Sequence, residues 1–594
     1  MSGTTGRLNF LVLSRRTRVL LAIWFLATLG LGAWGYYHYE AEAGASISVL
    51  TALYHSAQLF ILHAPHFEHP VNPALEAARW SAAILFGGTV FQAARQLFPS
   101  EFATLRFWRY SGHLVVGGLG RRGMKCVEVE RAKSRKCRRP VVVIDRVPPD
   151  DLAGRCAELG VQVITGNVND PAVLRAAGVH RAAELWALCG EDTINCETAV
   201  QAGRLAAGLR KDPSAPLRCN VHLSDVDLRV ELQRYASRAR LEAPLALRFF
   251  DLFDFEARRV LRQDLPIDHA GIGPGEIRQP HLVILGFGRM GRSIAVRAAK
   301  LGHFANGLTN PGRRLRISVI DRMGTQNEAA LLFRYPQFRE ACQLEVHQLD
   351  IESPAARRLV EEWCGDPASL SSLVICFDDQ ARATEVALRL LPGLRPDAVR
   401  VGVRIADREG LGSLVEQVWA GAGPLEVRTF GRLDEGCCDA ALDDENEILA
   451  RAIHDDYAAR RRAEGRDPSD RALASWEELD EDLRESNRQQ ADHILIKLRT
   501  AGWVQAPRSD PRPALDRFTD PEVELLARME HQRWNAERIL AGWKRGLRDL
   551  DGKTSPYLCD WEDLPDEVRE HDRSAVRAIP DLLTRIGMKA VRAG

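Results

Sequence analysis

Two glycine-rich segments have the residue types and spacing of a phosphate-binding turn. Each has glycines at its first, third and sixth positions, and each follows an apolar run, at 113–116 and at 282–285. Such glycines let the backbone turn sharply, approach a pyrophosphate and open a helix whose free N–H groups face the anion. Because the pattern occurs twice, it indicates a duplicated dinucleotide-binding module. The expected ligand contacts are Gly118, Gly120, Gly123, Gly286, Gly288 and Gly291.

An acidic residue ends a later apolar run in each module. Asp145 follows the run 141–144, and Asp321 follows the run 317–320. In a dinucleotide-binding unit, an acid at this position holds the ribose hydroxyls and disfavours a 2′-phosphate. The two acids therefore favour NAD(H) or another adenine nucleotide as the cofactor. The alternative is that the glycines serve only the close packing of helix against strand, so that no nucleotide binds.

Strand-like and helix-like runs alternate around these residues, which is typical of an α/β fold with a parallel sheet. The last predicted strands are 221–225 in the first unit and 399–405 in the second. The segment 173–195, which begins VLRAAGV and ends EDTIN, resembles the TrkA-N or RCK domain, the regulator of potassium conductance. The resemblance implies two Rossmann-like domains, at 111–270 and 278–435. It also implies face-to-face assembly into a homo-oligomer, a dimer or a tetramer.

Residues 1–110 are predicted to form an α-helical membrane region. The segment 19–39 contains no charged residue and is long enough to cross about 30 Å of hydrocarbon. A second span is predicted at 77–97. Arginines precede the first span and follow the second, whereas residues 37–78 contain no Lys or Arg. The positive-inside rule then places the N-terminus and the C-terminal domains in the cytoplasm. We therefore expect a multi-pass protein of the bacterial inner (cell) membrane, in contact with membrane lipid.

A further apolar segment, 45–64, lies between the predicted spans. One interpretation is a re-entrant helix, as in two-span cation channels, which would make a monovalent cation a partner. The other is an amphipathic helix at the membrane interface, with no conduction. The potassium-filter sequence TVGYG is absent from the chain, so the sequence leaves both interpretations open.

The C-terminal region, 440–594, contains a second duplication. A clear copy at 520–590 repeats elements of a degenerate copy at 445–503, including Trp-Glu-x-Leu and Arg-Glu-x-x-Arg. The clear copy contains His-Gln-Arg-Trp-Asn, Gly-Trp-Lys and Ser-Pro-Tyr-Leu, and it resembles the RyR domain, the repeat of ryanodine receptors. The resemblance to RyR domains of bacterial defence systems implies an α-helical sensor of a nucleotide-derived second messenger.

Aromatic and basic side chains of the clear copy are the candidates for binding such a ligand. Trp and Tyr stack on bases, whereas Arg and Lys pair with phosphate. The alternative is that the tryptophans form the core of a small domain. The candidates are Trp534, Arg538, Trp543, Lys544, Tyr557 and Trp561.

Composition limits the classes of function. The 594-residue chain has 80 Lys and Arg and 80 Asp and Glu, so it lacks the excess positive charge of a protein that binds nucleic acid generally. Its 12 cysteines are scattered without the spacing of a metal site. No catalytic His/Asp pair follows either glycine segment in a substrate domain, so we expect neither a metal site nor an enzyme.

These observations favour a membrane-anchored, channel-like effector or sensor. In this hypothesis a cytosolic nucleotide-type ligand binds the RCK-like or RyR-like domains and controls ion flux or membrane integrity, with anti-phage defence as a setting. One alternative is a non-conducting regulatory subunit of a cation transporter. The other is a membrane-bound NAD-dependent oxidoreductase.

Overall fold

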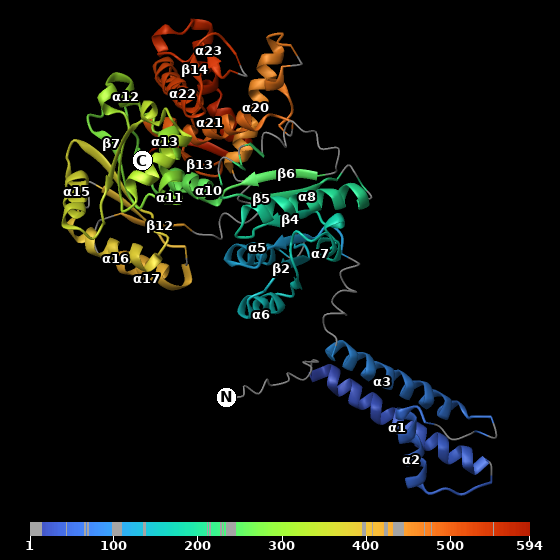
Figure 1. The fold of residues 1–594 in the computed structure, drawn as a ribbon. Helices are drawn as coiled ribbons and strands as arrows, with labels where there is room; N and C mark the ends of the chain where they lie inside the picture. The colour runs from blue at the N-terminus through green and yellow to red at the C-terminus, as the bar shows by residue number, and fades with distance from the viewer. Residues whose placement is uncertain are drawn as a thin grey trace. The chain divides into compact units, whose positions relative to one another are not determined.

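The computed structural model divides the chain into two compact units, Met1–Arg109 and Tyr110–Gly594 (Figure 1). The residues that it describes are 15–42, 44–63, 67, 70–97, 110–134, 138–210, 212, 215–225, 228–229, 231–232, 245–394, 399–406, 408–420, 426–431, 445–467, 470–476, 478–549 and 552–593.

The N-terminal unit is a helical hairpin with a short helix beside it. Two long helices, α1 (Arg15–Glu42) and α3 (Pro73–Leu97), pack side by side, and α2 (Val49–Gln58) packs against α1 (Figure 1). Small residues allow this contact: a Cβ on Gly35 would lie 2.8 Å from the Cα of Leu75. Contacts through small residues are typical of helix packing in membranes.

Among the described helices, one segment is long and apolar enough to cross a membrane, Leu20–Glu42 within α1. It matches the predicted span 19–39. The second predicted span, 77–97, lies within α3 and stays a prediction. The segment predicted at 45–64 contains α2 and one turn of 3₁₀ helix, η1 (Leu59–Ile61). Ten α-helical residues rise about 15 Å, half the hydrocarbon thickness, so α2 is too short to be a full span.

The second unit begins with a six-stranded parallel sheet in the order β3-β2-β1-β4-β5-β6. This is the strand order of a dinucleotide-binding Rossmann sheet. Its central strands are fully buried, as expected for a parallel sheet with both faces covered. The strands are β1 (Leu114–Gly117), β2 (Val141–Asp145), β3 (Gln162–Thr165), β4 (Glu184–Ala187), β5 (Leu217–His222) and β6 (Leu245–Phe250), with helices α5 (Arg121–Ala132), α6 (Asp150–Glu158), α7 (Pro171–Ala176) and α8 (Asp192–Leu209).

A second parallel sheet repeats this topology in the order β12-β11-β10-β7-β8-β9. Two parallel Rossmann-like sheets confirm the predicted α/β class. The strands predicted at 221–225 and 399–405 are present as β5 and β11, but neither is the last of its sheet, because β6 or β12 follows it. The elements are β7 (Gln279–Leu285), α11 (Arg289–Leu301), α12 (Ala305–Thr309), β8 (Arg316–Asp321), α13 (Gly324–Arg334), α14 (Phe338–Ala341), β9 (Gln343–Gln348), α15 (Pro354–Gly365), β10 (Ser369–Ile375), α16 (Gln380–Leu390), β11 (Val399–Arg404), α17 (Ser413–Ala420) and β12 (Val427–Phe430).

The helix α10 (Leu252–Arg259) connects the two sheets and packs against α11. A π-helical turn, η3 (Val260–Asp264), follows it. The apolar core continues from this connection through the second sheet into the C-terminal helices. The second sheet and the tail therefore share one core.

The tail is helical, as predicted, with two small sheets. Its first half contains α20 (Glu445–Ala463), α21 (Glu481–Thr500) and β13 (Trp503–Pro507), and its second half begins with α22 (Asp520–Leu540). The end of the second half contains two successive helices and not one, because Pro580 lies in the first turn of a new helix. The remaining elements are α23 (Asp566–Arg577), α24 (Ile579–Arg585), β16 (Met588–Arg592), β14 (Lys544–Arg545) and β15 (Thr554–Ser555).

Candidate nucleotide cradles and a cleft in the tail

The first glycine turn joins β1 to α5, and its three glycines have different roles. Gly118 has a φ of +100°, and a Cβ there would lie 3.1 Å from the nitrogen of Cys189. A Cβ on Gly123 would lie 1.9 Å from the oxygen of Gly118, so the helix needs glycine there to pack on the turn. Gly120 caps α5 in extended conformation, and no atom of the described chain lies within 4 Å of its Cβ position. The middle glycine thus faces open space at a helix N-terminus, which favours an anion.

The second turn, between β7 and α11, repeats this geometry. Gly286 has a φ of +92°, and a Cβ on Gly291 would lie 2.2 Å from the Gly286 oxygen. Gly288 caps α11, and its Cβ position is open within 4 Å among the described atoms. Both turns therefore combine two glycines that the fold requires with one that leaves room for a ligand.

Each predicted ribose-binding acid is tied to its own glycine turn. The Leu119 N–H donates to one carboxylate oxygen of Asp145 at 2.6 Å, and the Phe287 N–H donates to one of Asp321 at 2.7 Å. The other oxygen of Asp145 accepts the Val147 N–H at 2.9 Å. These bonds hold the end of the second strand against the turn. A carboxylate oxygen has two lone pairs, so the acids retain acceptor capacity for ribose hydroxyls.

The EDTIN segment joins strand ends at the edge that carries the first glycine turn. The Asn195 amide donates to the carbonyls of Cys189 and His222, both at 3.0 Å. The Asp192 carboxylate accepts the backbone N–H groups of Ser224 and Asp225 at 2.8–3.0 Å. These residues therefore shape the edge where Rossmann sheets bind ligands. Among the described residues, no group of three His, Cys, Asp or Glu side chains is placed to hold a metal ion.

The two halves of the tail repeat the same buried contacts. An imidazole nitrogen of His454 lies 2.8 Å from the carbonyl oxygen two residues before Trp476, and the corresponding distance from His531 to the carbonyl before Trp561 is also 2.8 Å. Each histidine also lies against its tryptophan, with ring centroids 5.9 and 5.8 Å apart. The residue offsets are those of the sequence repeat, so the halves share a local fold.

Ion pairs and strands follow the same correspondence. Arg488 binds Glu447 at 2.6 Å in the first half, and Arg573 binds Glu524 at 2.8 Å in the second. The strands that end the two halves, β13 and β16, pair with each other antiparallel. Antiparallel pairing of equivalent strands relates the two halves by an approximate twofold axis.

A cleft of about 460 Å³ lies between the halves. Each half contributes an aromatic ring with an arginine over it: the Arg461 guanidinium carbon lies 6.0 Å from the Tyr457 ring, and that of Arg538 lies 5.5 Å from the Trp534 ring. Asp572 also lines the cleft, and burial raises the pKa of its carboxyl well above the usual range. The cleft therefore offers stacking surfaces, cations and a buried carboxyl group that can hydrogen-bond a base edge.

The structure brings together half of the six candidates predicted in the tail. Trp534 and Arg538 line the cleft, and Trp543 joins them because the Arg538 guanidinium carbon lies 4.9 Å from its ring. Lys544 is exposed on β14, and Tyr557 is half-buried against the core. Trp561 is buried with its indole N–H donating to Glu524 at 2.9 Å, as the core alternative predicts.

Sequence reasoning missed the first half's contribution to the cleft. Tyr457 and Arg461 occupy the positions of Trp534 and Arg538 in the repeat, 77 residues earlier in the chain. Applying the repeat alignment to the binding candidates, as well as to the tryptophans, would have found both residues.

Comparison with known domain families gives two matches. Residues 114–211 match the TrkA-N domain, and residues 513–592 match the RyR domain. The chain thus carries a TrkA-N domain in its first Rossmann unit and an RyR domain in the second half of its tail. No curated protein matches the sequence.

Solved structures of GsuK are similar to much of the chain. The GsuK channel bound to NAD has a TM-score of 0.39 and 13% identity, over 86% of this chain and 90% of that one. GsuK bound to ADP has a TM-score of 0.36 and 16% identity, over 70% of this chain and 95% of that one. A GsuK mutant has a TM-score of 0.38 and 15% identity, over 72% of this chain and 99% of that one.

Proposed function

We propose that the chain is a membrane-anchored, ligand-gated effector or sensor. A nucleotide-type ligand binds its cytosolic domains and controls ion flux or membrane integrity. The observation that carries the proposal is the pair of glycine turns, each of which leaves the space over a helix N-terminus open at Gly120 and Gly288. An adenine nucleotide suits these cradles because Asp145 and Asp321 stand at the ribose position.

The N-terminal unit supports membrane attachment. Large apolar side chains are exposed on its helices, among them Leu20 at 65%, Trp80 at 67% and Ile84 at 58%. An exposed apolar surface of this kind fits lipid. We propose that α3 forms a second span beside α1, and that both termini lie in the cytoplasm of a bacterial cell. Assembly as a dimer or tetramer would place several such hairpins around a monovalent cation path.

The tail cleft is the second proposed nucleotide site. Its two arginine–aromatic pairs are suited to a base and a phosphate, and its position in the RyR-type tail suggests a second messenger produced in anti-phage defence. The proposal assigns binding and signalling to the chain and includes no catalytic step.

A non-conducting regulatory subunit is the second candidate function. The observation that favours it is the absence of a TVGYG filter from the sequence. In this case the same ligands bind, but purified protein alone conducts no ions.

Isothermal titration of the full-length protein with NAD and with ADP tests the binding step. Gly120→Asp and Gly288→Asp place a carboxylate in each cradle at positions without steric conflict, so the expected result is a loss of affinity of at least tenfold in the affected unit. Gly154→Asp and Gly365→Asp are matched controls, because their Cβ positions are also open. Equal affinity in wild type and all four variants would overturn the cradle assignment.

A further inference from the structure

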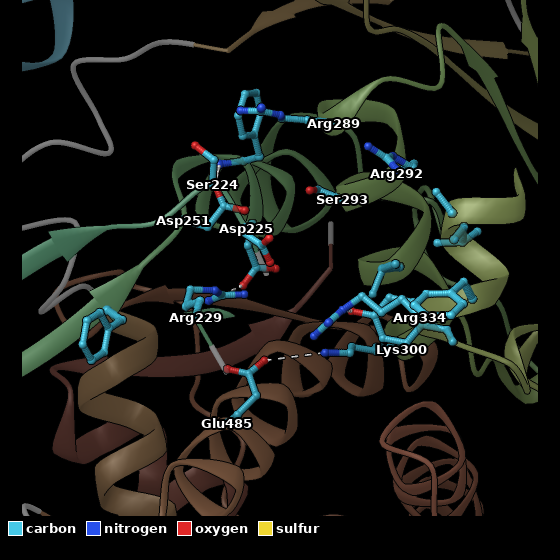
Figure 2. A pocket seen from close by; sticks show the side chains of 18 of the residues that line it. Ser224, Asp225, Arg229, Asp251, Arg289, Arg292, Ser293, Lys300, Arg334 and Glu485 are labelled. Atoms are coloured by element: carbon cyan, nitrogen blue, oxygen red, sulfur yellow. Dashed lines mark hydrogen bonds and ion pairs between the residues drawn. The ribbon is translucent and has the colours of Figure 1, made fainter. Parts of the chain in front are cut away.

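A second cavity, of about 760 Å³, lies where the first Rossmann sheet, the second Rossmann unit and the tail meet (Figure 2). One wall is a face of α11 with Arg289, Arg292, Ser293 and Lys300. The rest of the lining comes from the loop after β5, the region where β6 ends and α10 begins, α13 and the start of α21. None of the six fingerprint glycines lines it, but Arg289 belongs to the second glycine turn and Arg292 follows that turn, so the cavity adjoins the second glycine cradle.

Five cations line this cavity together with six acids. Several of the acids are engaged by arginines behind the wall. Asp254 and Glu485 both bind the buried Arg297, at 2.7 and 3.2 Å, and Glu481 binds Arg488 at 2.6 Å. The five cations are Arg229, Arg289, Arg292, Lys300 and Arg334, and the six acids are Asp225, Asp251, Asp254, Glu481, Asp482 and Glu485.

Two of the cavity's arginines have unsatisfied charge. Within the described part of the chain, neither Arg289 nor Arg292 has a carboxylate within the 4.0 Å of an ion pair. They stand three residues apart on α11, so their side chains project from the same face. Burial and the neighbouring Arg289 both lower the pKa of Arg292, whereas Asp321 raises it in part. A bound anion would relieve the repulsion between the two arginines. The hydroxyl of Ser293, which also lines the cavity, could donate a hydrogen bond to that anion (Figure 2).

We propose that this junction cavity binds a phosphorylated small molecule, with Arg289 and Arg292 holding its anionic groups. The volume falls within the range of small-molecule sites. The site adjoins the second glycine cradle, but its lining comes from residues that the cradle does not use, and its occupation by phosphate does not depend on nucleotide binding there. Because its walls come from both Rossmann units and the tail, the ligand stabilises the arrangement in which the three meet.

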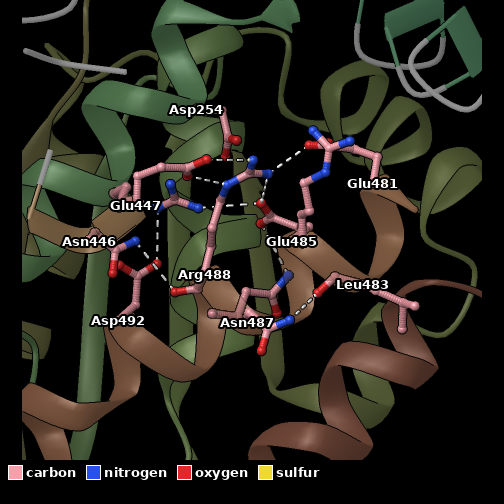
Figure 3. A network of polar contacts seen from close by, with 12 residues as sticks. Asp254, Asn446, Glu447, Glu481, Leu483, Glu485, Asn487, Arg488 and Asp492 are labelled. Atoms are coloured by element: carbon pink, nitrogen blue, oxygen red, sulfur yellow. Dashed lines mark hydrogen bonds and ion pairs between the residues drawn. The ribbon is translucent and has the colours of Figure 1, made fainter. Parts of the chain in front are cut away.

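The back of the cavity connects the ligand to the tail. Arg297 lies on the buried face of α11 and contacts Asp254 of α10 and both Glu485 and Asp492 of α21. Figure 3 shows Asp254, Glu485 and Asp492 in one network with Arg488 and Glu447. A ligand that fixes α11 therefore acts on helices of the linker and of the tail through ion pairs that already exist.

The test uses tripolyphosphate as the probe and Ser293→Cys as the reporter in the full-length protein. The modification rate of residue 293 by a charged thiol reagent is measured by mass spectrometry, with and without the probe. We expect at least fivefold protection. Arg289→Gln combined with Arg292→Gln should abolish the protection, whereas Arg357→Gln, an exposed arginine on α15, should preserve it.

Two results would overturn the proposal: no protection in the wild-type background, or undiminished protection in the double variant. Thermal unfolding of the double variant shows whether its fold is intact, and removing a repulsive pair is expected to leave it so. Protection without nucleotide-dependent ion flux would leave the cavity as a ligand site and refute only the proposed function. Nucleotide-dependent ion flux without protection would refute the cavity assignment and leave the proposed function standing.

Discussion

The guanidinium of Arg297, on α11, lies 3.2 Å from the carboxylate of Glu485, on α21. Arg297 is only 1% exposed. A buried ion pair of this kind costs desolvation free energy, so it is retained only where its geometry is well satisfied. Here it joins the second Rossmann unit to the first half of the tail.

Removing Arg297 should strongly destabilise the part of the chain formed by the second Rossmann unit and the tail. Arg297→Met removes the most deeply buried cation of this network and leaves Arg258 as the cation that Glu485 and Asp492 share. Breaking a buried pair costs about 3–5 kcal/mol. The expected result is a clear fall in Tm in a thermal melt. Arg389→Met is the matched control, because Arg389 pairs with Glu385 on an exposed surface. Surface pairs contribute about 0–1 kcal/mol. Equal Tm values for the two variants would show that the buried network contributes no stability.

Glu256 should make stability depend on pH. Burial raises the pKa of its carboxyl from 4.5 to about 7, although Arg404, Arg259 and Arg122 lower it in part. The folded state therefore retains a proton that the unfolded state releases between pH 4.5 and 7. Stability falls as pH rises through this window, by about 3 kcal/mol at most, since one pKa unit is about 1.4 kcal/mol.

Glu256→Gln removes this titration, so its stability advantage over wild type should grow from pH 4.5 to 7 and then level off. Denaturant unfolding at a series of pH values measures this difference in the free energy of unfolding. Burial also raises the pKa of Asp251 to about 6, but Asp251 is present in both proteins, so its titration largely cancels in the comparison. A pH-independent difference between the two proteins would contradict the buried placement of Glu256.

The glycines of each turn should separate into two classes on substitution. Gly118→Ala forces a Cβ onto a residue with positive φ and within 3.1 Å of Cys189, so it should lower stability by about 1–3 kcal/mol. Gly120→Ala meets no atom within 4 Å among the described residues and should leave Tm unchanged. Thermal melts of both variants provide the comparison. A larger loss for Gly120→Ala than for Gly118→Ala would refute the assigned geometry.

The packing of the N-terminal hairpin should depend on side-chain size at Gly35 and not at Gly30. Gly35→Leu would drive a side chain into the backbone at Leu75, whereas the Cβ position of Gly30 is open within 4 Å of the described atoms. We expect Gly35→Leu to separate α1 from α3 and Gly30→Leu to leave them packed. Disulfide trapping between cysteines placed at 32 and 78 reports the contact, since a Cβ on Gly32 would lie 3.4 Å from the Cβ of Ala78. Equal trapping in both variants would argue against this packing.

The sequence predicted the elements whose signals are local. Each glycine fingerprint, its preceding strand and its following helix were placed correctly, because φ at Gly118 and Gly286 and the close approach at Gly123 and Gly291 impose glycine directly. The sixth strands were missed because β6 and β12 form sheet edges and are only partly buried, so their apolar pattern is weak. The boundary between α23 and α24 has a local signal too, since Pro580 lies in the first turn of α24.

The binding sites were less predictable because they combine distant segments. Trp534 and Arg538 could be predicted from residue type, but Trp561 is the same residue type and lies in the core. What separates them is tertiary packing: Glu524 takes the indole N–H of Trp561, whereas Trp534 faces a second repeat 77 residues away in sequence. The junction cavity draws on three parts of the chain, and of its lining residues Arg289 lies within a glycine motif.

The central claim is that nucleotide binding to the cytosolic domains controls the membrane unit. Its most direct test is ion flux from liposomes that contain only the purified full-length protein, with NAD, ADP or a cyclic dinucleotide added outside. The account predicts ligand-dependent flux that is lost in Gly120→Asp combined with Gly288→Asp, or in Arg538→Ala combined with Arg461→Ala, according to which site the active ligand uses. It also predicts that flux survives in Gly154→Asp. Ligand binding without any change in flux or membrane integrity would contradict it and favour the non-conducting regulatory subunit.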